Sequence, residues 1–189
     1  ERWKELDEQA TAANESIQQL FYYYMFYLRA LEKDTKSTTP GVRKYYSSNK
    51  FERLYQSELL DNLFVMIELW KVINKGEVLE DESWSSNIQI KQTLDTLTSY
   101  PNEFWKYPVI IYYICYRKDK NFEDKFARFL NKLLAELMTK YILIPTINAV
   151  KGDILKLNSA IVVSDIPKFD FKELDQAQLE AGIQNPHRN

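Results

Sequence analysis

Residues 50–74 read KFERLYQSELLDNLFVMIELWKVIN, and their apolar side chains recur at intervals of three and four residues. This spacing is the period of one face of an α-helix. Lys71 and Lys75 suit the negative end of the helix dipole, and Gly76 suits the left-handed conformation of a C-cap. We therefore predict a long amphipathic helix from Lys50 to Asn74, whose buried face consists of Tyr55, Leu59, Leu63, Met66, Ile67, Trp70 and Ile73.

Similar apolar stripes lie on both sides of this segment. Upstream, Ser16 with Gln19 three residues later fits the N-terminus of a helix through Leu28, and Trp3 and Leu6 lie on a helical stretch before it. That helix is apolar on nearly every face, so it either lies inside a bundle or meets a partner. Downstream we expect four further helices, at residues 87–98, 108–117, 122–141 and 147–161.

Turn-forming residues separate these segments. Residues 34–49 are predicted to form a long loop around Pro40-Gly41, and Pro145 is predicted to end or kink the helix before it. The tail from Ser164 is polar, with one short helix expected after Asp170, which Glu173 would help to cap. Four glycines and six prolines are too few for a turn-rich fold. We predict an all-α protein, an irregular bundle of about six to eight helices at residues 1–163, followed by a C-terminal tail at 164–189.

Charge and cysteine content limit the partners and the compartment. The net charge is −2, which provides no general attraction for nucleic acid or anionic membrane, so any such binding must be local. The single cysteine, Cys115, lies in an apolar run and indicates a buried free thiol in the cytoplasm. The most apolar stretches, residues 20–31 and 107–116, are shorter than the ~20 residues of a membrane span. No membrane association is expected.

The residue types required for common catalytic sites are scarce. One cysteine and one histidine cannot form the usual zinc site, and His187 lies in the polar tail, where an oriented general base is not expected. The four glycines are scattered along the chain and do not form a phosphate-binding loop. The acidic run at residues 80–82 is interpreted as solvated surface. We predict no catalytic, cofactor-binding or metal-binding residue in this segment.

Basic and aromatic side chains alternate in TTPGVRKYY and the residues after it, 38–53. Cations could contact phosphates there while tyrosines stack on bases, which is the arrangement of single-strand binders. Against this, tyrosine is abundant throughout the chain, and lysines near a helix start are often merely solvated. The candidate nucleic-acid contacts are Arg43, Lys44, Tyr45, Tyr46, Lys50 and Arg53.

Residues 129–161, FLNKLLAELMTKYILIPTINAVKGDILKLNSAI, resemble the helical middle region of the large bacterial GmrSD-type family, the ParB-like DGQQR-domain proteins (domain of unknown function 262). FYYYMFYLRA at 21–30 and TTPGVRKYYSSNKFERLY at 38–55 resemble the preceding part of that region. The resemblance implies an upstream nucleotide-handling domain and often a downstream HNH-type nuclease. Family members include modification-dependent restriction enzymes that act against phage DNA. Neither catalytic signature occurs here, so no catalytic residue is carried over.

Two functional hypotheses follow. In the first, the chain is a non-catalytic scaffold or linker excised from a GmrSD-like, nucleotide-dependent, DNA-targeting restriction protein; it contacts flanking domains and DNA, and only the parent is an endonuclease. In the second, it is a self-standing helical module that binds a protein or a second copy of itself. Buried aromatics beside an exposed basic ridge would favour the first, and a large exposed aromatic patch the second.

Overall fold

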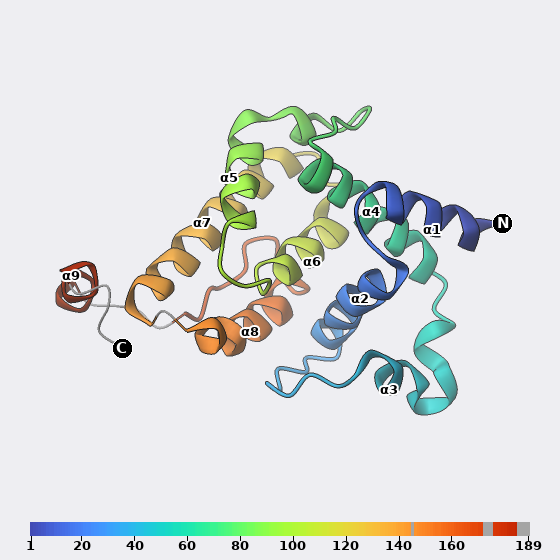
Figure 1. Ribbon diagram of the computed structural model, residues 1–189, viewed down its shortest axis with the longest axis horizontal. Coiled ribbons are helices and arrows are strands. Elements are labelled where there is room, and N and C mark those ends of the chain that lie inside the picture. Colours follow the sequence, from blue (N-terminus) through green and yellow to red (C-terminus); the bar gives the residue numbers. More distant parts are fainter. Residues whose placement is uncertain (145, 172–175, 185–189) are drawn as a thin grey trace.

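The computed structural model of the chain describes residues 1–144, 146–171 and 176–184, and every regular element within these ranges is a helix (Figure 1). The all-α prediction is confirmed, although the nine α-helices of the described ranges exceed the six to eight that were expected. In chain order the elements are α1 (Arg2–Ala12), α2 (Ile17–Leu31), α3 (Val42–Ser47), the 3-10 helix η1 (Ser48–Leu54), α4 (Leu59–Lys75), η2 (Ser83–Ser86), α5 (Ile88–Thr98), α6 (Lys106–Tyr116), α7 (Phe122–Leu143), η3 (Ile147–Val150), α8 (Lys151–Ile161) and α9 (Gln176–Gln184).

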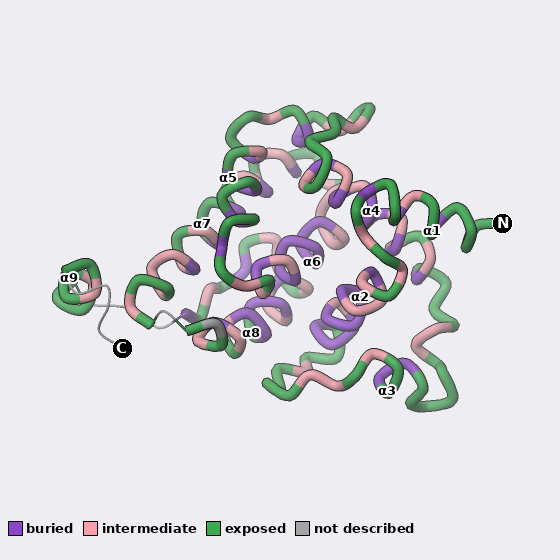
Figure 2. Tube along the Cα trace, viewed as in Figure 1, coloured by how far each residue is buried: buried purple, intermediate pink, exposed green. Residues whose placement is uncertain are grey.

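Helix α6 lies at the centre of the bundle. It packs against α2, α4, α7 and α8, and its middle residues Val109 to Tyr113 are fully buried (Figure 2). Helix α2 is the second buried element, since Tyr23, Tyr24 and Phe26 are at most 2% exposed. The aromatic content of α2 is therefore largely core, because burial of large rings is the main contribution to packing energy.

Local signals set several helix ends, of which those at Ser16 and Gly76 were predicted. The Ser16 hydroxyl accepts a hydrogen bond from the Gln19 N–H at 3.1 Å, and the Asn87 side chain accepts one from Ile90 N–H at 3.1 Å. Gly76 ends α4 with a left-handed φ of 67°. These caps satisfy backbone groups that have no partner inside the helix, so the chain stops or starts helices there.

The helix predicted from Lys50 begins instead at Leu59, so its first nine residues were assigned wrongly. Asn49, Lys50 and Phe51 all adopt left-handed backbone angles, with φ of 50°, 55° and 64°. Each non-glycine residue in this conformation costs about 1–2 kcal/mol, and a right-handed helix cannot pass through it. The apolar spacing of Tyr55 with α4 was coincidental, because Tyr55 is 81% exposed.

The region before this turn also differs from the prediction. Residues 34–49 were expected to be a long loop, but they contain the short helix α3 at Val42–Ser47. Tyr45 and Tyr46 of this helix are 7% and 5% exposed. Their contacts with α2 stabilise a helix that is too short to persist alone.

The C-terminal half follows the predicted order with small shifts. Helix α6 begins at Lys106, so Pro108 lies in its first turn, where a missing N–H is tolerated. Asn121 suits the N-cap position by residue type, and it occupies that position in α7 without a side-chain hydrogen bond to the helix. Helix α7 ends at Leu143, just before Pro145, and Pro145 itself lies outside the described residues, as do Glu173 and His187.

The short helix expected in the tail is present as α9, which packs on α7 at one end of the molecule (Figure 1). The contact is close at Gly182, where a Cβ atom would lie 3.1 Å from the Leu143 side chain. Among the described residues, no helix combines the length and the apolar character needed to cross a bilayer.

Candidate nucleic-acid interface

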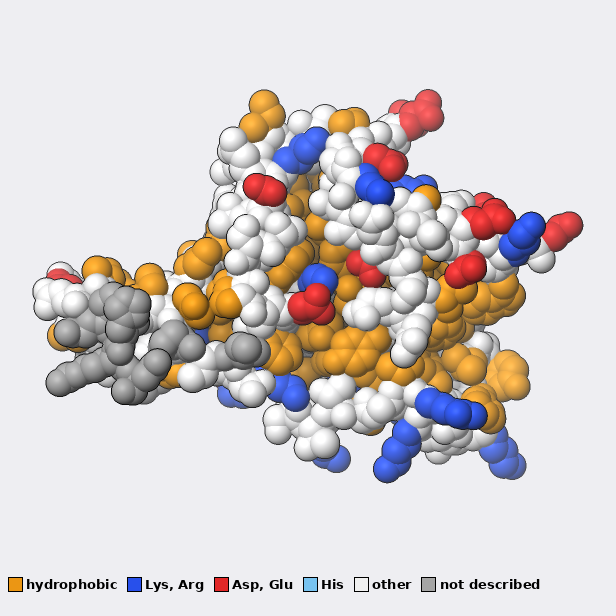
Figure 3. Space-filling model, in the orientation of Figure 1, with side chains coloured by type: hydrophobic (Ala, Val, Ile, Leu, Met, Phe, Trp, Pro, Cys, Tyr) orange, Lys and Arg blue, Asp and Glu red, His pale blue; other side chains and the backbone are white. Residues whose placement is uncertain are grey.

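Positive charge is concentrated between α2 and α4. Residues 33–53, here called the basic segment, carry six basic and two acidic side chains, whereas the whole chain has 25 and 27. The remainder therefore has 19 basic and 25 acidic residues. Figure 3 shows lysine and arginine side chains projecting from the edge of the molecule where Figure 1 places α3. This edge is the part of the visible surface most suited to a polyanion.

The buried side chain of Arg29 holds the start of the basic segment in place. Its side chain is 1% exposed; Nε donates to Asp34 Oδ2 at 2.9 Å and Nη2 donates to the Lys36 carbonyl at 2.6 Å. The Lys36 N–H donates to Asp34 Oδ1 at 3.0 Å. Desolvation opposes ionisation of Asp34, but the hydrogen bonds from Arg29 and Lys36 outweigh it and lower its pKa. The connection after α2 is thus tied to the core while Lys33 and Lys36 remain exposed.

The two tyrosines predicted to stack on bases are not available for that role. Tyr46 donates its hydroxyl to the Phe21 carbonyl at 2.8 Å, and the Tyr45 hydroxyl lies 3.4 Å from Glu32 Oε1. Burial raises the pKa of Tyr45 to about 12. Both rings belong to the packing between α3 and α2, so the stacking role proposed for Tyr45 and Tyr46 must be corrected.

The four predicted cations divide into two kinds. Arg43, Lys44 and Lys50 are exposed. Arg53 instead forms a forked ion pair with Glu32, donating from Nε to Oε1 at 3.0 Å and from Nη2 to Oε2 at 3.2 Å. Its Nη1 donates to the Tyr45 carbonyl at 3.1 Å. Arg43, Lys44 and Lys50 can therefore reach a phosphate directly. Arg53 instead links η1 to Glu32 and to the Tyr45 carbonyl.

Two aromatic residues that the sequence did not single out lie beside these cations. Phe51 is 49% exposed and Tyr55 is 81% exposed. The predicted helix placed Tyr55 on a buried face, and the left-handed turn removes it from that face. The run Ser47-Ser48-Asn49 was the available signal, because serine and asparagine cluster in turns and asparagine tolerates positive φ.

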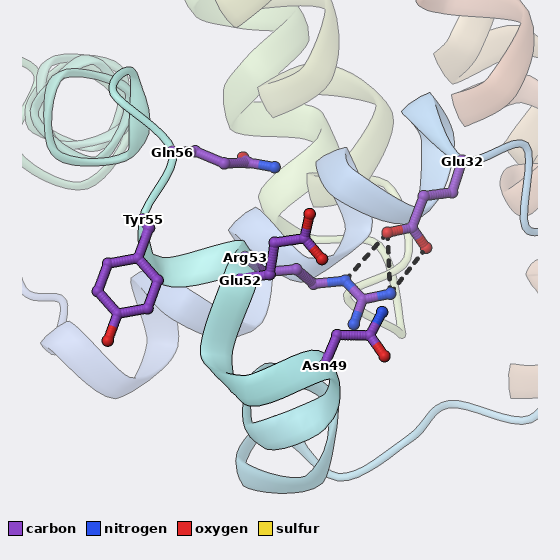
Figure 4. A pocket seen from close by; sticks show the side chains of 6 residues that line it. All are labelled: Glu32, Asn49, Glu52, Arg53, Tyr55 and Gln56. Atoms are coloured by element: carbon purple, nitrogen blue, oxygen red, sulfur yellow. Dashed lines mark hydrogen bonds and ion pairs between the residues drawn. The ribbon is translucent and has the colours of Figure 1, made fainter.

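A polar pocket of about 420 Å³ opens on η1 (Figure 4). Glu52 and Asn49 lie beside the Arg53 side chain, Gln56 lines the pocket farther from the guanidinium, and the Tyr55 ring points away from it. The Gln56 Oε1 accepts a hydrogen bond from the Tyr24 hydroxyl at 3.3 Å. The pocket therefore presents amide and carboxylate groups around a fixed cationic plane.

A second hollow of about 260 Å³ lies between α4 and the start of α6. Lys106 Nζ is 2.8 Å from Glu103 and 5.4 Å from the centre of the Trp70 ring. Desolvation raises the pKa of nearby Glu15. The chain's own cation thus occupies the aromatic face of this hollow.

Groups capable of nucleophilic or metal chemistry are few in the described part of the chain. Cys115 is largely buried, which raises the pKa of its thiol to about 11, so it is protonated at neutral pH and a weak nucleophile. Within residues 1–144, 146–171 and 176–184, no three His, Cys, Asp or Glu side chains gather in a group that could hold a metal ion.

Comparison of the chain with family models, curated proteins and solved structures gives no significant match.

Proposed function

We propose that the chain is a non-catalytic helical scaffold that contacts DNA phosphates through Arg43, Lys44 and Lys50. The observation that carries this proposal is the exposure of these three cations on one edge, in a chain whose remaining charge is net negative. Most phosphate contacts in protein–DNA complexes set position and affinity without reading sequence, and exposed cations are sufficient for them. Burial of the α2 aromatics beside this basic edge supports a scaffold more than a bare interaction module.

We further propose that the scaffold is the helical region of a bacterial, cytoplasmic GmrSD-like restriction protein, in which it holds a nucleotide-dependent domain and a nuclease domain. The resemblance at residues 21–55 and 129–161 supports this assignment. The central packing of α6 against four helices supports a rigid spacer. The surrounding reading frame tests it: a DGQQR segment upstream and an HNH-type signature downstream are expected, and the absence of both would overturn it.

Simultaneous replacement of Arg43, Lys44 and Lys50 by glutamate is expected to weaken binding to duplex DNA about 10-fold or more at low salt. Each lost phosphate contact also lowers the slope of log K against log salt by roughly 0.9, so the slope should fall by about 3. Fluorescence anisotropy with a labelled 20-base-pair duplex over a salt series measures both quantities.

The matched control replaces Lys118, Lys120 and Lys168 by glutamate. These lysines are exposed and lie outside the basic segment, so the net charge changes equally while the edge is preserved. The control should lose much less duplex affinity than the variant of the basic segment, because the two variants share only the effect of the changed net charge. Equal losses in both variants would show that only overall charge matters, and the proposed interface would be abandoned.

A self-association module is the second candidate, and exposure of Trp3 favours it. Trp3 is 51% exposed and stacks on Phe21 with ring centres 6.2 Å apart. Tryptophan is enriched among the residues that dominate binding energy at interfaces.

If this second function holds, the native chain should dimerise in sedimentation equilibrium, and Trp3→Glu should weaken dimerisation about 30-fold, the equivalent of 2 kcal/mol. Val78→Glu is the control, because Val78 is 62% exposed and lies on a different part of the chain. A native chain that stays monomeric at every concentration would exclude this function.

A further inference from the structure

We infer that the pocket on η1 holds one unstacked base of a single-stranded nucleic acid. The inference rests on the proposed nucleic-acid function, because the same basic segment supplies the phosphate contacts. It adds the class of nucleic acid and the residues that contact the base.

The platform is the guanidinium of Arg53. Its Cζ atom lies 4.1 Å from the centre of the Tyr45 ring, which covers one face of the guanidinium plane. The forked pair with Glu32 prevents rotation of that plane. Arg53 also lines the pocket, so a flat ring that enters meets a planar guanidinium that is already held in place and whose charge is paired with Glu32. Proteins that bind single-stranded RNA stack bases on arginine planes in this way.

The groups around the platform can bind the edge of a base. Gln56 Oε1 is engaged by Tyr24, which directs its NH₂ group to serve as a donor elsewhere. Glu52 is exposed and, as a carboxylate, accepts hydrogen bonds only. Asn49 provides a donor and an acceptor. Adenine, cytosine and guanine carry an exocyclic amino group that can donate to Glu52, whereas thymine and uracil offer only the single ring N3–H as a donor.

Tyr55 provides a stacking surface for the adjacent base. In Figure 4 its ring points away from the Arg53–Glu32 pair, and it is 81% exposed. Lys50 lies in the same short element as Arg53 and is exposed, so its ammonium group is free to contact the phosphate backbone of the strand. Alternation of cations with aromatic faces is the general design of single-strand binding surfaces.

Duplex DNA could not use these groups fully. Its bases are paired and stacked, and the major groove admits a helix or a two-stranded ribbon. Helix α3, which precedes the pocket in the chain, has only six residues and buries Tyr45 and Tyr46 against α2. A single strand can place an unpaired base in the pocket without first opening a duplex.

The backbone supports the same assignment. Three successive non-glycine residues, Asn49 to Phe51, adopt left-handed angles. Such conformations persist only where the surroundings hold them and are concentrated at functional sites. Here the turn brings Asn49 to the pocket and leaves Phe51 half exposed on the outside.

The test measures anisotropy of labelled 12-mers of dA, dC and dT and of a 12-base-pair duplex with the full chain. We expect the native chain to prefer single strands over the duplex, and dA or dC over dT. Tyr55→Ala should weaken binding of single strands roughly 5- to 100-fold and leave duplex binding nearly unchanged. The control, Tyr141→Ala, removes another partly exposed tyrosine far along the chain and should change neither.

Glu52→Ala should bring the dC-to-dT affinity ratio close to one, although the loss of a negative charge raises both affinities. Glu77→Ala is the control for that charge, because Glu77 is exposed outside the basic segment. Circular dichroism verifies that each variant is folded. An unchanged dC-to-dT ratio in Glu52→Ala, or unchanged single-strand affinity in Tyr55→Ala, overturns the base pocket but not the phosphate contact. A native chain that binds none of the oligonucleotides overturns both.

Discussion

Phe126→Ala is expected to lower the free energy of unfolding by about 3–5 kcal/mol. Phe126 is fully buried on α7, and its ring centre lies 4.9 Å from that of Phe122, 5.5 Å from Trp84 and 6.0 Å from Tyr112. Removing the ring loses its transfer free energy and leaves a cavity among side chains that are themselves fixed by packing. The neighbouring helix α6 would lose the contact of Tyr112 with this ring, while Tyr112 would keep its stacking on Phe129, with ring centres 4.2 Å apart.

Urea denaturation monitored by far-ultraviolet circular dichroism measures this loss. Phe51→Ala is the matched control, since it removes the same side chain from a position that is 49% exposed. We expect the control to change stability by less than about 1 kcal/mol. A loss below about 1 kcal/mol for Phe126→Ala would mean that Phe122, Trp84 and Tyr112 can move into the space left by the ring. Their packing would then not be rigid.

Arg29→Ala is expected to destabilise the protein by about 3 kcal/mol and to release the start of the basic segment. The substitution removes the hydrogen bonds to Asp34 and the Lys36 carbonyl and leaves Asp34 without its cationic partner. Arg2→Ala is the control, because the Arg2–Asp61 pair is 58% and 70% exposed and exposed pairs contribute little. A loss equal to that of the control would contradict the anchoring role of Arg29.

The effect of Arg29→Ala should depend on pH. Because the folded-state pKa of Asp34 is lowered, its contribution is fully present above the ordinary value of 3.8 and is lost as pH falls through the lower folded-state pKa. The stability difference between the native chain and Arg29→Ala should therefore be constant from pH 7 to pH 5 and should shrink at pH 3. Urea titrations at these three pH values measure it. A difference that grows towards acid pH would contradict the assigned cause.

Features that depend on nearest neighbours were predictable. The cap at Ser16 and the glycine at 76 act within one helical turn, so residue type and spacing were sufficient to locate them. The all-α class followed for the same reason, from apolar residues recurring at helical intervals. The central position of α6 agrees with its apolar run, which has no polar face.

The candidate interface was predictable as a charged region but not as a site. The cations of residues 43–53 are visible in the sequence, whereas the burial of Tyr46 depends on a carbonyl 25 residues earlier. The pairing of Arg53 likewise depends on Glu32, 21 residues away. Nothing in the sequence distinguishes the Phe21 carbonyl from other backbone carbonyls, or Glu32 from the other acidic residues, as the partner of these side chains.

The amino-acid sequence by itself determined the helical class, most helix ends and the location of the basic segment, because these depend on backbone propensity and on residues three or four positions apart. Only the tertiary structure decided that Tyr45 and Tyr46 are buried, that Phe51 and Tyr55 are exposed and that helix α4 starts after a left-handed turn. Exposure is set by contacts between segments distant in the chain, and the free energy of those contacts outweighs the local preference of a short stretch for a helix.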